Sequence, residues 1–437
     1  MRVLHLNDLY DPRIGSSIRQ MYQEAERLRE LGHEAAVLSV TQDPALVGAG
    51  PFGEQEVLGS RVFLAHSEYN PRWRGWVGLD NPRTRDAVAA VLDEYRPDVI
   101  HTHLIHTHLS YAALGAARRR GAGVVFTAHD VMTFCYQKLT CFHGGPEAGG
   151  ERRDYPAHWS KCIPCQRLRF RPGRNSAIRR VLERDVDRFT VVSDELGRAI
   201  GANGIRVDRT VWNAIRPQRR LPSAAEVAAF RAARGLEGAQ VIAIGGRLHE
   251  QKGVGQLLQM VAKLAGEFPA LRLMVMGKRD VYDREFAPLA AELGVADRVV
   301  PTGWLDGDEL QQAYAAVDVF VTPSICFDTF GLVNLEAMEH SKPVVATVFG
   351  GSQEVVLDGE TGYIANPFDV AGFAERIGQL LRDPARAEAM GAAGHRRMVD
   401  FFTIERLTDE FLEEYELARA AARERTTGSV GGTAGGR

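Results

Sequence analysis

The sequence predicts an α/β protein made of two doubly wound domains, each a parallel sheet with helices on both faces. The chain has 437 residues, a length that allows two domains which each bury a core. Short apolar runs typical of buried strands alternate with helical patterns in both halves. Residues 216–238 separate the halves and are rich in Pro, Arg and Ala, so we place the boundary after residue 215.

The order of the predicted strands and helices supports two doubly wound domains. The first predicted strand, residues 3–7, is not a signal peptide, because it has no long apolar core and no small-residue cleavage site. A helix over residues 17–31 follows and ends at Gly32. In the second half, helices are predicted over 332–340 and 402–417. The other predicted strands are 35–40, 62–65, 98–101, 124–127 and 189–193, then 241–245, 271–277, 298–300, 317–322, 343–346 and 362–364.

Composition narrows the class of protein. The formal net charge is -3, which disfavours a dedicated nucleic-acid binder. No apolar run is long enough to span a bilayer. We therefore expect a cytoplasmic protein and leave peripheral membrane contact open. Residues 424–437 are rich in Gly, Thr and Ser and are predicted to be disordered.

Two cations follow a buried strand in the second half. Arg247 and Lys252 come after the apolar run 241–244 and a Gly-Gly pair. Two cations at the carboxyl end of a strand suit a diphosphate, whose charge needs paired donors. The alternative is a pair of solvated surface cations.

A second cluster lies about eighty residues further on. Asp328 precedes Phe330, Gly331, Leu332 and Val333, where a helix is predicted to begin. The free N–H groups of a helix start form an anion site. A second acid, Glu336, lies inside that helix. Cations, a helix N-terminus and two acids in one half of a chain indicate a nucleotide-sugar site.

These residues resemble the motifs of retaining glycosyltransferase family 4. That family carries Arg and Lys at the positions of Arg247 and Lys252, and two Glu residues separated by seven others. Here the spacing holds, but the first acid is Asp328. The resemblance runs to about residue 417 and implies the GT-B fold, two Rossmann-like domains facing across a cleft. It also implies a last helix, residues 402–423, that crosses back to the first domain.

The resemblance assigns roles to these positions. Arg247 and Lys252 would bind the donor diphosphate, Glu336 the ribose hydroxyls, and Asp328 the hydroxyls of the transferred sugar. The base would be recognised near Gly303, in the segment 303–305. No divalent cation is needed for such chemistry, so no catalytic metal is expected.

Three further donor contacts are predicted in the first half. Gly15 and Ser16 stand where family members have Gly-Gly, and the loop is not a dinucleotide fingerprint. His129, at the end of a strand, resembles the family's active-site histidine; the alternative is a loop histidine satisfied by Asp130. A neighbouring group of histidines is interpreted as strand-end residues lining the acceptor cleft rather than as a metal site: His101, His103, His106 and His108.

A cysteine cluster marks residues 131–166 as an insertion in the first domain. Four thiolates suit a closed tetrahedral zinc site, and an insertion without its own core needs such a clamp. Reduced thiols or an iron–sulfur cluster are the alternatives, and His143 and His158 could replace one ligand. The predicted zinc ligands are Cys135, Cys141, Cys162 and Cys165.

Arginines crowd residues 167–188. They form either a solvated helix face or a contact with an anionic acceptor or membrane surface.

The sequence thus predicts a retaining glycosyltransferase that uses a nucleotide diphosphate sugar and a hydroxyl acceptor, with a structural zinc. Two alternatives stay open: a sugar-nucleotide epimerase of the same fold, and a degraded transferase that acts as a donor-binding scaffold. The base, the sugar, the acceptor and the oligomeric state are left undetermined.

Overall fold

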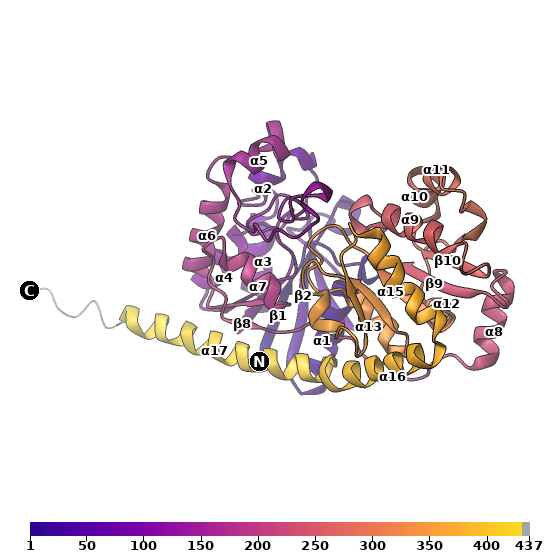
Figure 1. Cartoon of the computed structure of the whole chain (residues 1–437). Coiled ribbons are helices and arrows are strands. Elements are labelled where there is room, and N and C mark those ends of the chain that lie inside the picture. Colours follow the sequence, from indigo (N-terminus) through magenta and orange to yellow (C-terminus); the bar gives the residue numbers. More distant parts are fainter. Residues whose placement is uncertain (431–437) are drawn as a thin grey trace, which may run out of the picture. The chain divides into compact units, whose positions relative to one another are not determined.

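The computed structural model describes residues 1–430, and the side chains of residues 1–427, as two compact units (Figure 1). Unit 1 comprises Met1–Lys138, Tyr155–Asn213 and the C-terminal helix from Ile404, and unit 2 comprises Leu139–Asp154 and Ala214–Thr403. The chain therefore passes between the units four times. The division after Asn213 lies close to the boundary predicted from composition.

Unit 1 is built on an eight-stranded sheet with the order β3-β4-β2-β1-β5-β6-β7-β8. All neighbouring strands are parallel except β3, which pairs antiparallel with β4. The chain leaves β1 for β2 on one side and later returns to β5 on the other, so β1 and β5 flank a topological switch point. The strands are Arg2–Leu6 (β1), Glu34–Thr41 (β2), Gly53–Val57 (β3), Ser60–His66 (β4), Val99–Thr102 (β5), Gly123–Ala128 (β6), Arg188–Val191 (β7) and Arg209–Thr210 (β8).

Two of these strands were not predicted. β3 reads GEQEV, a polar edge strand with little apolar signal, and β8 has two residues. The other six follow the predicted apolar runs. Unit 1 helices are Ser16–Glu30 (α1), Arg74–Val77 (α2), Arg85–Tyr95 (α3), Ala112–Arg119 (α4), Trp159–Gln166 (α5), Arg174–Asp185 (α6), Asp194–Gly201 (α7) and Ile404–Val430 (α17).

Unit 2 holds a six-stranded, all-parallel sheet with the order β11-β10-β9-β12-β13-β14. All six strands match predicted ones, and β9 and β12 flank its switch point. The strands are Gln240–Gly245 (β9), Leu271–Met276 (β10), Val299–Pro301 (β11), Val319–Thr322 (β12), Val344–Thr347 (β13) and Gly362–Ala365 (β14). The helices are Ala224–Ala233 (α8), Val254–Leu264 (α9), Arg279–Glu285 (α10), Ala287–Glu292 (α11), Gly307–Ala315 (α12), Leu332–Glu339 (α13), Ser352–Val355 (α14), Val370–Arg382 (α15) and Pro384–Phe401 (α16).

Amphipathic helices bury one face on each sheet. In unit 1, Ile18, Met21 and Tyr22 of α1 pack with Val37 and Leu64 of the sheet. In unit 2, α9 and α15 supply much of one core, with Leu257, Val261 and Ile377 fully buried. Apolar spacing of three and four residues puts these side chains on one helix face.

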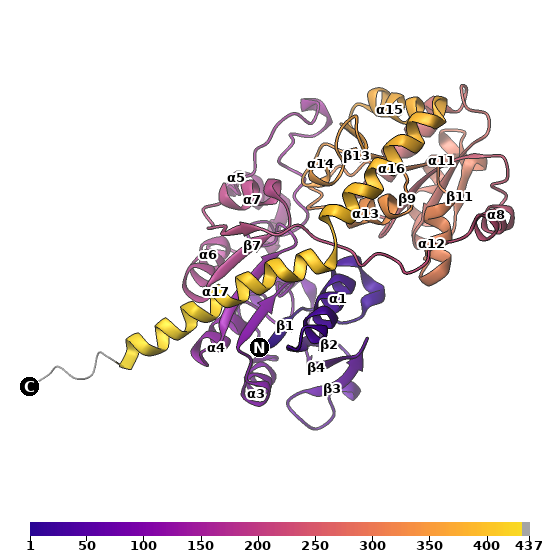
Figure 2. The same cartoon turned by 90° about the horizontal axis from the view of Figure 1, so that it is seen from below.

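Helix α17 extends further than the sequence predicted. It packs along α1 and β6 of unit 1 (Figure 2). The predicted disorder from residue 424 is wrong for residues 424–430, which continue the helix. Arg425 forms an ion pair with Asp187 and donates to the carbonyl of Ala122, so this last part of the helix is tied to the unit. The rest of the predicted tail, residues 431–437, lies outside the described residues.

The predicted insertion 131–166 is divided between the two units. Residues Leu139–Asp154 belong to unit 2, whereas the parts before and after them belong to unit 1. Within residues 1–430, no helix combines the length and apolar character needed to cross a bilayer.

Candidate functional site

The turn after β9 places Arg247 and Lys252 where the sequence predicted a diphosphate site. Gly246 has φ +103°, and Gly253 has φ +75° just before α9. A Cβ on Gly253 would lie 1.9 Å from the carbonyl oxygen of Pro323, so this close approach requires glycine. The Arg247 side chain is exposed. The turn therefore holds both cations at the carboxyl end of the strand.

Lys252 meets the first predicted acid directly. Its Nζ lies 3.1 Å from Oδ2 of Asp328, and the hydroxyl of Ser324 donates to the same oxygen at 3.0 Å. Burial lowers the pKa of Lys252, but the Asp328 carboxylate together with the Cys326 thiol more than offsets burial, and the pKa is raised above its usual value. Lys252 is therefore charged at neutral pH. Lys252 and Asp328 were predicted to bind different parts of the donor, but their side chains form an ion pair. The sequence patterns did not indicate the contact of Ser324 with Asp328.

The main chain of Asp328 is fixed by the segment after β13. Its N–H donates to the carbonyl of Phe349 at 3.1 Å, and Gly351 donates to its carbonyl at 2.7 Å. Gly350 has φ +89°, and a Cβ there would lie 2.1 Å from the Asp328 oxygen. The main chain of Asp328 is therefore hydrogen-bonded on both sides to the loop after β13.

The second acid has a partner that the sequence did not indicate. Oε2 of Glu336 on α13 accepts a hydrogen bond of 2.6 Å from the hydroxyl of Tyr314 on α12. The Tyr314 ring is buried and lies against Phe320. No local motif marks Tyr314, because the contact joins two helices of unit 2.

Helix α13 begins without a side-chain cap. Its N-cap is Gly331, with φ +84°, and a Cβ there would lie 2.6 Å from Nδ2 of Asn334. Leu332 and Val333 in the first turn are half-buried. Phe330 is buried and packs edge-on against Phe402. The anion site at the backbone of 331–333 stays a prediction, and the Phe330 ring packs in the core.

Gly303 follows β11 in a turn with φ +84°, and a Cβ there would meet no atom within 4 Å. Open space beside a main-chain turn is compatible with the predicted base contact, which stays a prediction.

We expect Tyr314→Phe to weaken nucleoside diphosphate binding about fivefold to tenfold. The phenol holds the carboxylate proposed to bind the ribose, and a hydrogen bond to a charged group contributes roughly 1.5–3 kcal/mol, part of which water replaces. Calorimetric titration with UDP and GDP measures the change. The control Tyr363→Phe removes another buried hydroxyl of unit 2, on β14, and an equal loss in both variants would contradict a specific role for Tyr314.

In unit 1, Gly15 and Ser16 form the start of α1. Gly15 is extended, with φ −178°, and caps the helix without a side chain. The hydroxyl of Ser16 accepts from Arg19 at 3.1 Å. A Cβ on Gly15 would meet nothing within 4 Å, so no packing constraint requires glycine here. Their donor contact stays a prediction.

His129 directly follows the carboxyl end of β6, and its side chain is buried. Its Nε2 lies 2.9 Å from Nδ1 of His103. Burial lowers the pKa of His129 to about 3, so the ring is neutral at physiological pH. Asp130 instead faces His106 at 3.3 Å. The alternative in which Asp130 satisfies His129 is therefore wrong, because Asp130 pairs with His106 and Nε2 of His129 pairs with His103, which follows the neighbouring strand β5.

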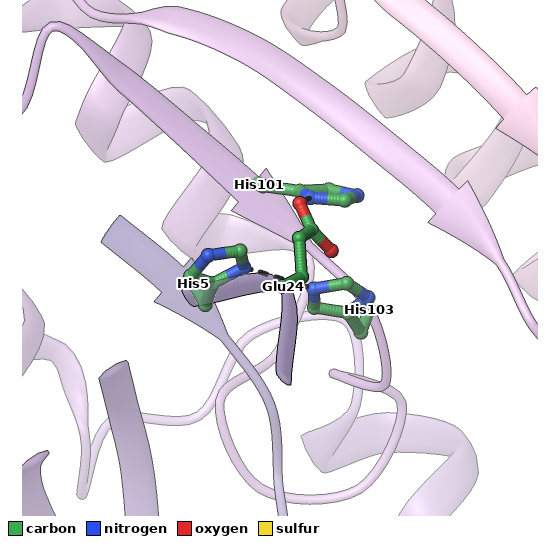
Figure 3. A group of neighbouring side chains, drawn as sticks. All are labelled: His5, Glu24, His101 and His103. Atoms are coloured by element: carbon green, nitrogen blue, oxygen red, sulfur yellow. Dashed lines mark hydrogen bonds and ion pairs between the residues drawn. The ribbon is translucent and has the colours of Figure 1, made fainter. Parts of the chain in front are cut away.

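Behind His129 lies a buried polar cluster of His5, Glu24, His101 and His103, with ligand-type atoms all within 4.8 Å of one another. Figure 3 shows the Glu24 side chain lying among the three rings. Nδ1 of His5 is 3.1 Å from Nε2 of His103, and Nδ1 of His101 is 3.3 Å from Glu24. The predicted place of His101 and His103 at a cleft is wrong, since both are core residues of the sheet.

Burial dominates the electrostatics of this cluster. It lowers the pKa of His5 to about 4 and that of His101 to about 3, and it raises the pKa of Glu24. Three neutral rings in the chain His5–His103–His129 allow two consistent sets of tautomers. In one set Nδ1 of His129 accepts a hydrogen bond, and in the other it donates one.

The predicted zinc ligands are divided between the units. Cys135, Cys162 and Cys165 belong to unit 1 and Cys141 to unit 2. Among residues 1–430, the convergent group of metal-ligand side chains is the buried histidine cluster, which contains no cysteine. Of the two substitute ligands, His158 caps α5 and His143 donates to the carbonyl of Ile325. Zinc binding by the cysteines stays a prediction.

Comparisons with known proteins agree with this fold. Residues 16–214 match the glycosyl transferase 4-like domain, and residues 239–383 match glycosyl transferases group 1. The 2-deoxystreptamine glucosyltransferase of Streptomyces kanamyceticus is 33% identical over 93% of this chain and 99% of that protein. The GDP-mannose-dependent alpha-(1-6)-phosphatidylinositol monomannoside mannosyltransferase of Mycolicibacterium smegmatis is 36% identical, but the match covers 38% of this chain and 45% of that protein.

Solved structures show the same architecture. The crystal structure of HepE from Anabaena with UDP and glucose has a TM-score of 0.70 at 19% identity, over 95% of this chain and 99% of that one. Sucrose-phosphate synthase from Thermosynechococcus elongatus has a TM-score of 0.72 at 20% identity, over 96% and 100%. The two Rossmann-like units have the GT-B fold of these structures, and the sequence matches make the chain a glycosyltransferase. The chain belongs to glycosyltransferase family 4.

Proposed function

We propose that this enzyme transfers a sugar from a nucleotide diphosphate sugar to a hydroxyl acceptor with retention of anomeric configuration. The observation that carries the proposal is the pairing of Lys252 with Asp328 in the unit whose helix α13 begins uncapped at Gly331. The cation and the free N–H donors suit the diphosphate of such a donor, and the acid suits the hydroxyls of its sugar.

Each group has one task in this proposal. Arg247, Lys252 and the N-terminus of α13 stabilise the negative charge that grows on the leaving diphosphate. Fixed donors of this kind cost no reorganisation when the bond breaks. Glu336 accepts hydrogen bonds from the ribose, and Asp328 accepts them from the transferred sugar.

A thermal-shift screen against UDP-, GDP- and ADP-sugars tests the proposal, because a ligand that binds the folded state raises its stability. Turnover is then measured with acceptors of two kinds, 2-deoxystreptamine and phosphatidylinositol monomannoside, which the names of the two relatives suggest. A changed sugar in donor-only reactions would identify an epimerase. Binding without turnover across a broad acceptor screen would identify a scaffold.

We also propose a structural zinc held by the four cysteines that cluster in the sequence of residues 131–166. The supporting argument is chemical: four thiolates, two of them in a Cys-Ile-Pro-Cys corner, suit tetrahedral zinc. Elemental analysis of purified protein should give about one zinc per chain, as a single four-ligand site requires. Cys162→Ser should lose it, while Cys326→Ser, at the buried fifth cysteine, should keep it. Metal-free protein with native stability would refute this proposal.

We further propose that the arginine-rich segment 167–188 contacts an anionic membrane surface. Arg174 donates to the carbonyl of Met132 and Arg188 pairs with Glu414, so part of the arginine-rich segment is structural. Residues 155–182 contain no Asp or Glu, however. Unit 1 also has three exposed tryptophans, with exposed fractions of 48% to 65%: Trp73, Trp76 and Trp159. The guanidinium of Arg171 lies 4.2 Å from the ring centroid of Trp76.

We expect the protein to sediment with phosphatidylglycerol vesicles and not with pure phosphatidylcholine vesicles. Basic side chains beside interfacial aromatic rings favour an anionic surface. Changing Trp73 and Trp76 together to Ser should reduce sedimentation several-fold. The control Trp304→Ser removes an exposed tryptophan of unit 2. Equal sedimentation of all variants, or capture by both vesicle types, would contradict the proposal.

A further inference from the structure

We propose that Leu139–Asp154 is a working part of the donor-binding unit, and that His143 is a positioning residue for the Asp328 carboxylate. The inference rests on the proposed role of Asp328 as the sugar-binding acid. The segment, called the arm here, is joined at both ends to unit 1, yet it packs in unit 2. Rich in Gly, Glu and Arg, the arm lacks the apolar residues for a core of its own.

Two hydrogen bonds from the arm hold the chain just before Asp328. The N–H of Phe327 donates to the carbonyl of Leu139 at 2.9 Å, and Nε2 of His143 donates to the carbonyl of Ile325 at 2.8 Å. The other side of Asp328 is fixed by Phe349 and Gly351 of unit 2. The arm therefore supplies one of the two flanks that set the direction of this acid.

The tautomer of His143 is fixed by its two partners. The N–H of Gly145 donates to Nδ1 at 2.9 Å, so Nε2 carries the hydrogen that reaches Ile325. Burial lowers the pKa of His143, which keeps the ring neutral. Both nitrogens are used in main-chain contacts, and neither faces a substrate. The ring acts through the loop and not on the donor itself.

Aromatic packing ties the arm to the second flank as well. The His143 ring stacks on Phe349 with centroids 5.0 Å apart, and Phe142 meets Phe349 edge-on at 5.5 Å. Phe349 is the residue whose carbonyl holds the Asp328 N–H. The arm therefore contacts both segments that carry the acid.

The C-terminal part of the arm packs against the Phe349 ring as well. Gly150 has φ +70°, and a Cβ there would lie 2.8 Å from Phe349 and 2.8 Å from Phe368. Asn366 donates to the carbonyl of Gly149 at 2.5 Å. A substitution at Gly150 would thus press on Phe349, the ring on which His143 stacks.

The expected consequence is specific to the sugar. Glu336 is held by Tyr314 on α12, which is a separate contact from the arm. Loss of the arm's hydrogen bonds should therefore weaken binding and reaction of the sugar, and leave nucleoside diphosphate affinity unchanged. The ratio of the dissociation constants of UDP and UDP-glucose, or of GDP and GDP-mannose, reports the sugar's share of binding.

The experiment uses the full chain with His143→Ala, His143→Gln and the control His395→Ala. His395 also bonds a main-chain carbonyl of unit 2, that of Glu339, at 2.9 Å. We expect His143→Ala to lose most of the sugar's share of binding and at least tenfold in donor hydrolysis, with nucleoside diphosphate affinity changed less than twofold. His143→Gln keeps an N–H donor and should recover most of the loss. The control should match the parent.

A double variant separates this inference from the proposed function. If His143 acts through Asp328, adding His143→Ala to Asp328→Asn should cause no further loss. Full activity of Asp328→Asn would overturn the role of that acid and the inference with it. A slow Asp328→Asn beside a fully active His143→Ala would overturn the inference alone. If His143→Ala does not fold, His143→Phe decides, because it keeps a ring against Phe349 but removes the hydrogen bond to Ile325. The same loss is expected, and parental behaviour would overturn the inference.

Discussion

Lys252→Ala should reduce kcat/KM by roughly 30-fold to 5,000-fold, because truncating one partner of a hydrogen-bonded charge pair in a binding site costs roughly 2–5 kcal/mol. The variant loses a cation proposed for the diphosphate and also leaves Asp328 without its ion-pair partner. Asp328 is buried, so the melting temperature should fall too. Steady-state kinetics, UDP titration and thermal unfolding measure the three effects.

Two comparisons make this result specific. Lys263→Ala removes an exposed lysine from α9, next along the chain, and should leave kinetics and stability unchanged. Arg247→Ala removes an exposed cation and should weaken donor binding with little loss of stability. Parental kinetics in Lys252→Ala would remove this lysine from the site.

Asp328→Asn should lower turnover by roughly 10-fold to 150-fold, because hydrogen bonds from sugar hydroxyls to a charged acceptor contribute roughly 1.5–3 kcal/mol. The amide keeps the shape of the side chain but loses its charge. Nucleoside diphosphate affinity should stay the same or increase, since Lys252 no longer faces a carboxylate. Asp328→Glu should be better tolerated or change the preferred sugar, because the family's usual acid is one methylene longer.

The control for this second prediction is Asp297→Asn, which neutralises an exposed acid in a turn of unit 2. Kinetics with the donor found by thermal shift give turnover, and titration with the free nucleotide gives affinity. Turnover of Asp328→Asn equal to that of the parent would show that another group binds the sugar.

Local patterns in the sequence predicted most of the fold. Every predicted strand of unit 2 is present, because its buried parallel strands read as unbroken apolar runs. The polar edge strand β3 was missed for the same reason, since an edge strand has no such run. Motif spacing located the cations and acids, and the turns that carry them depend on glycines at Gly246, Gly253 and Gly331 with positive φ.

Contacts between distant residues were beyond the reach of these patterns. Tyr314 binds Glu336 across two helices, and His103 rather than the neighbouring Asp130 satisfies His129 across two strands. The histidines at the end of β5 looked like cleft residues, but the register of β1 beside β5 buries them against His5 and Glu24.

The sequence by itself determined the class of fold, the order of its elements and the residue types of the proposed donor site, because these follow from periodicity, glycine turns and short motifs along the chain. The tertiary structure alone decided which groups meet: Lys252 with Asp328, and the arm with the loop before that acid. The physical reason is that a segment with too few apolar residues for its own core takes its position from the surface that buries its few rings. That surface is formed by chain about two hundred residues away, at Phe327 and Phe349.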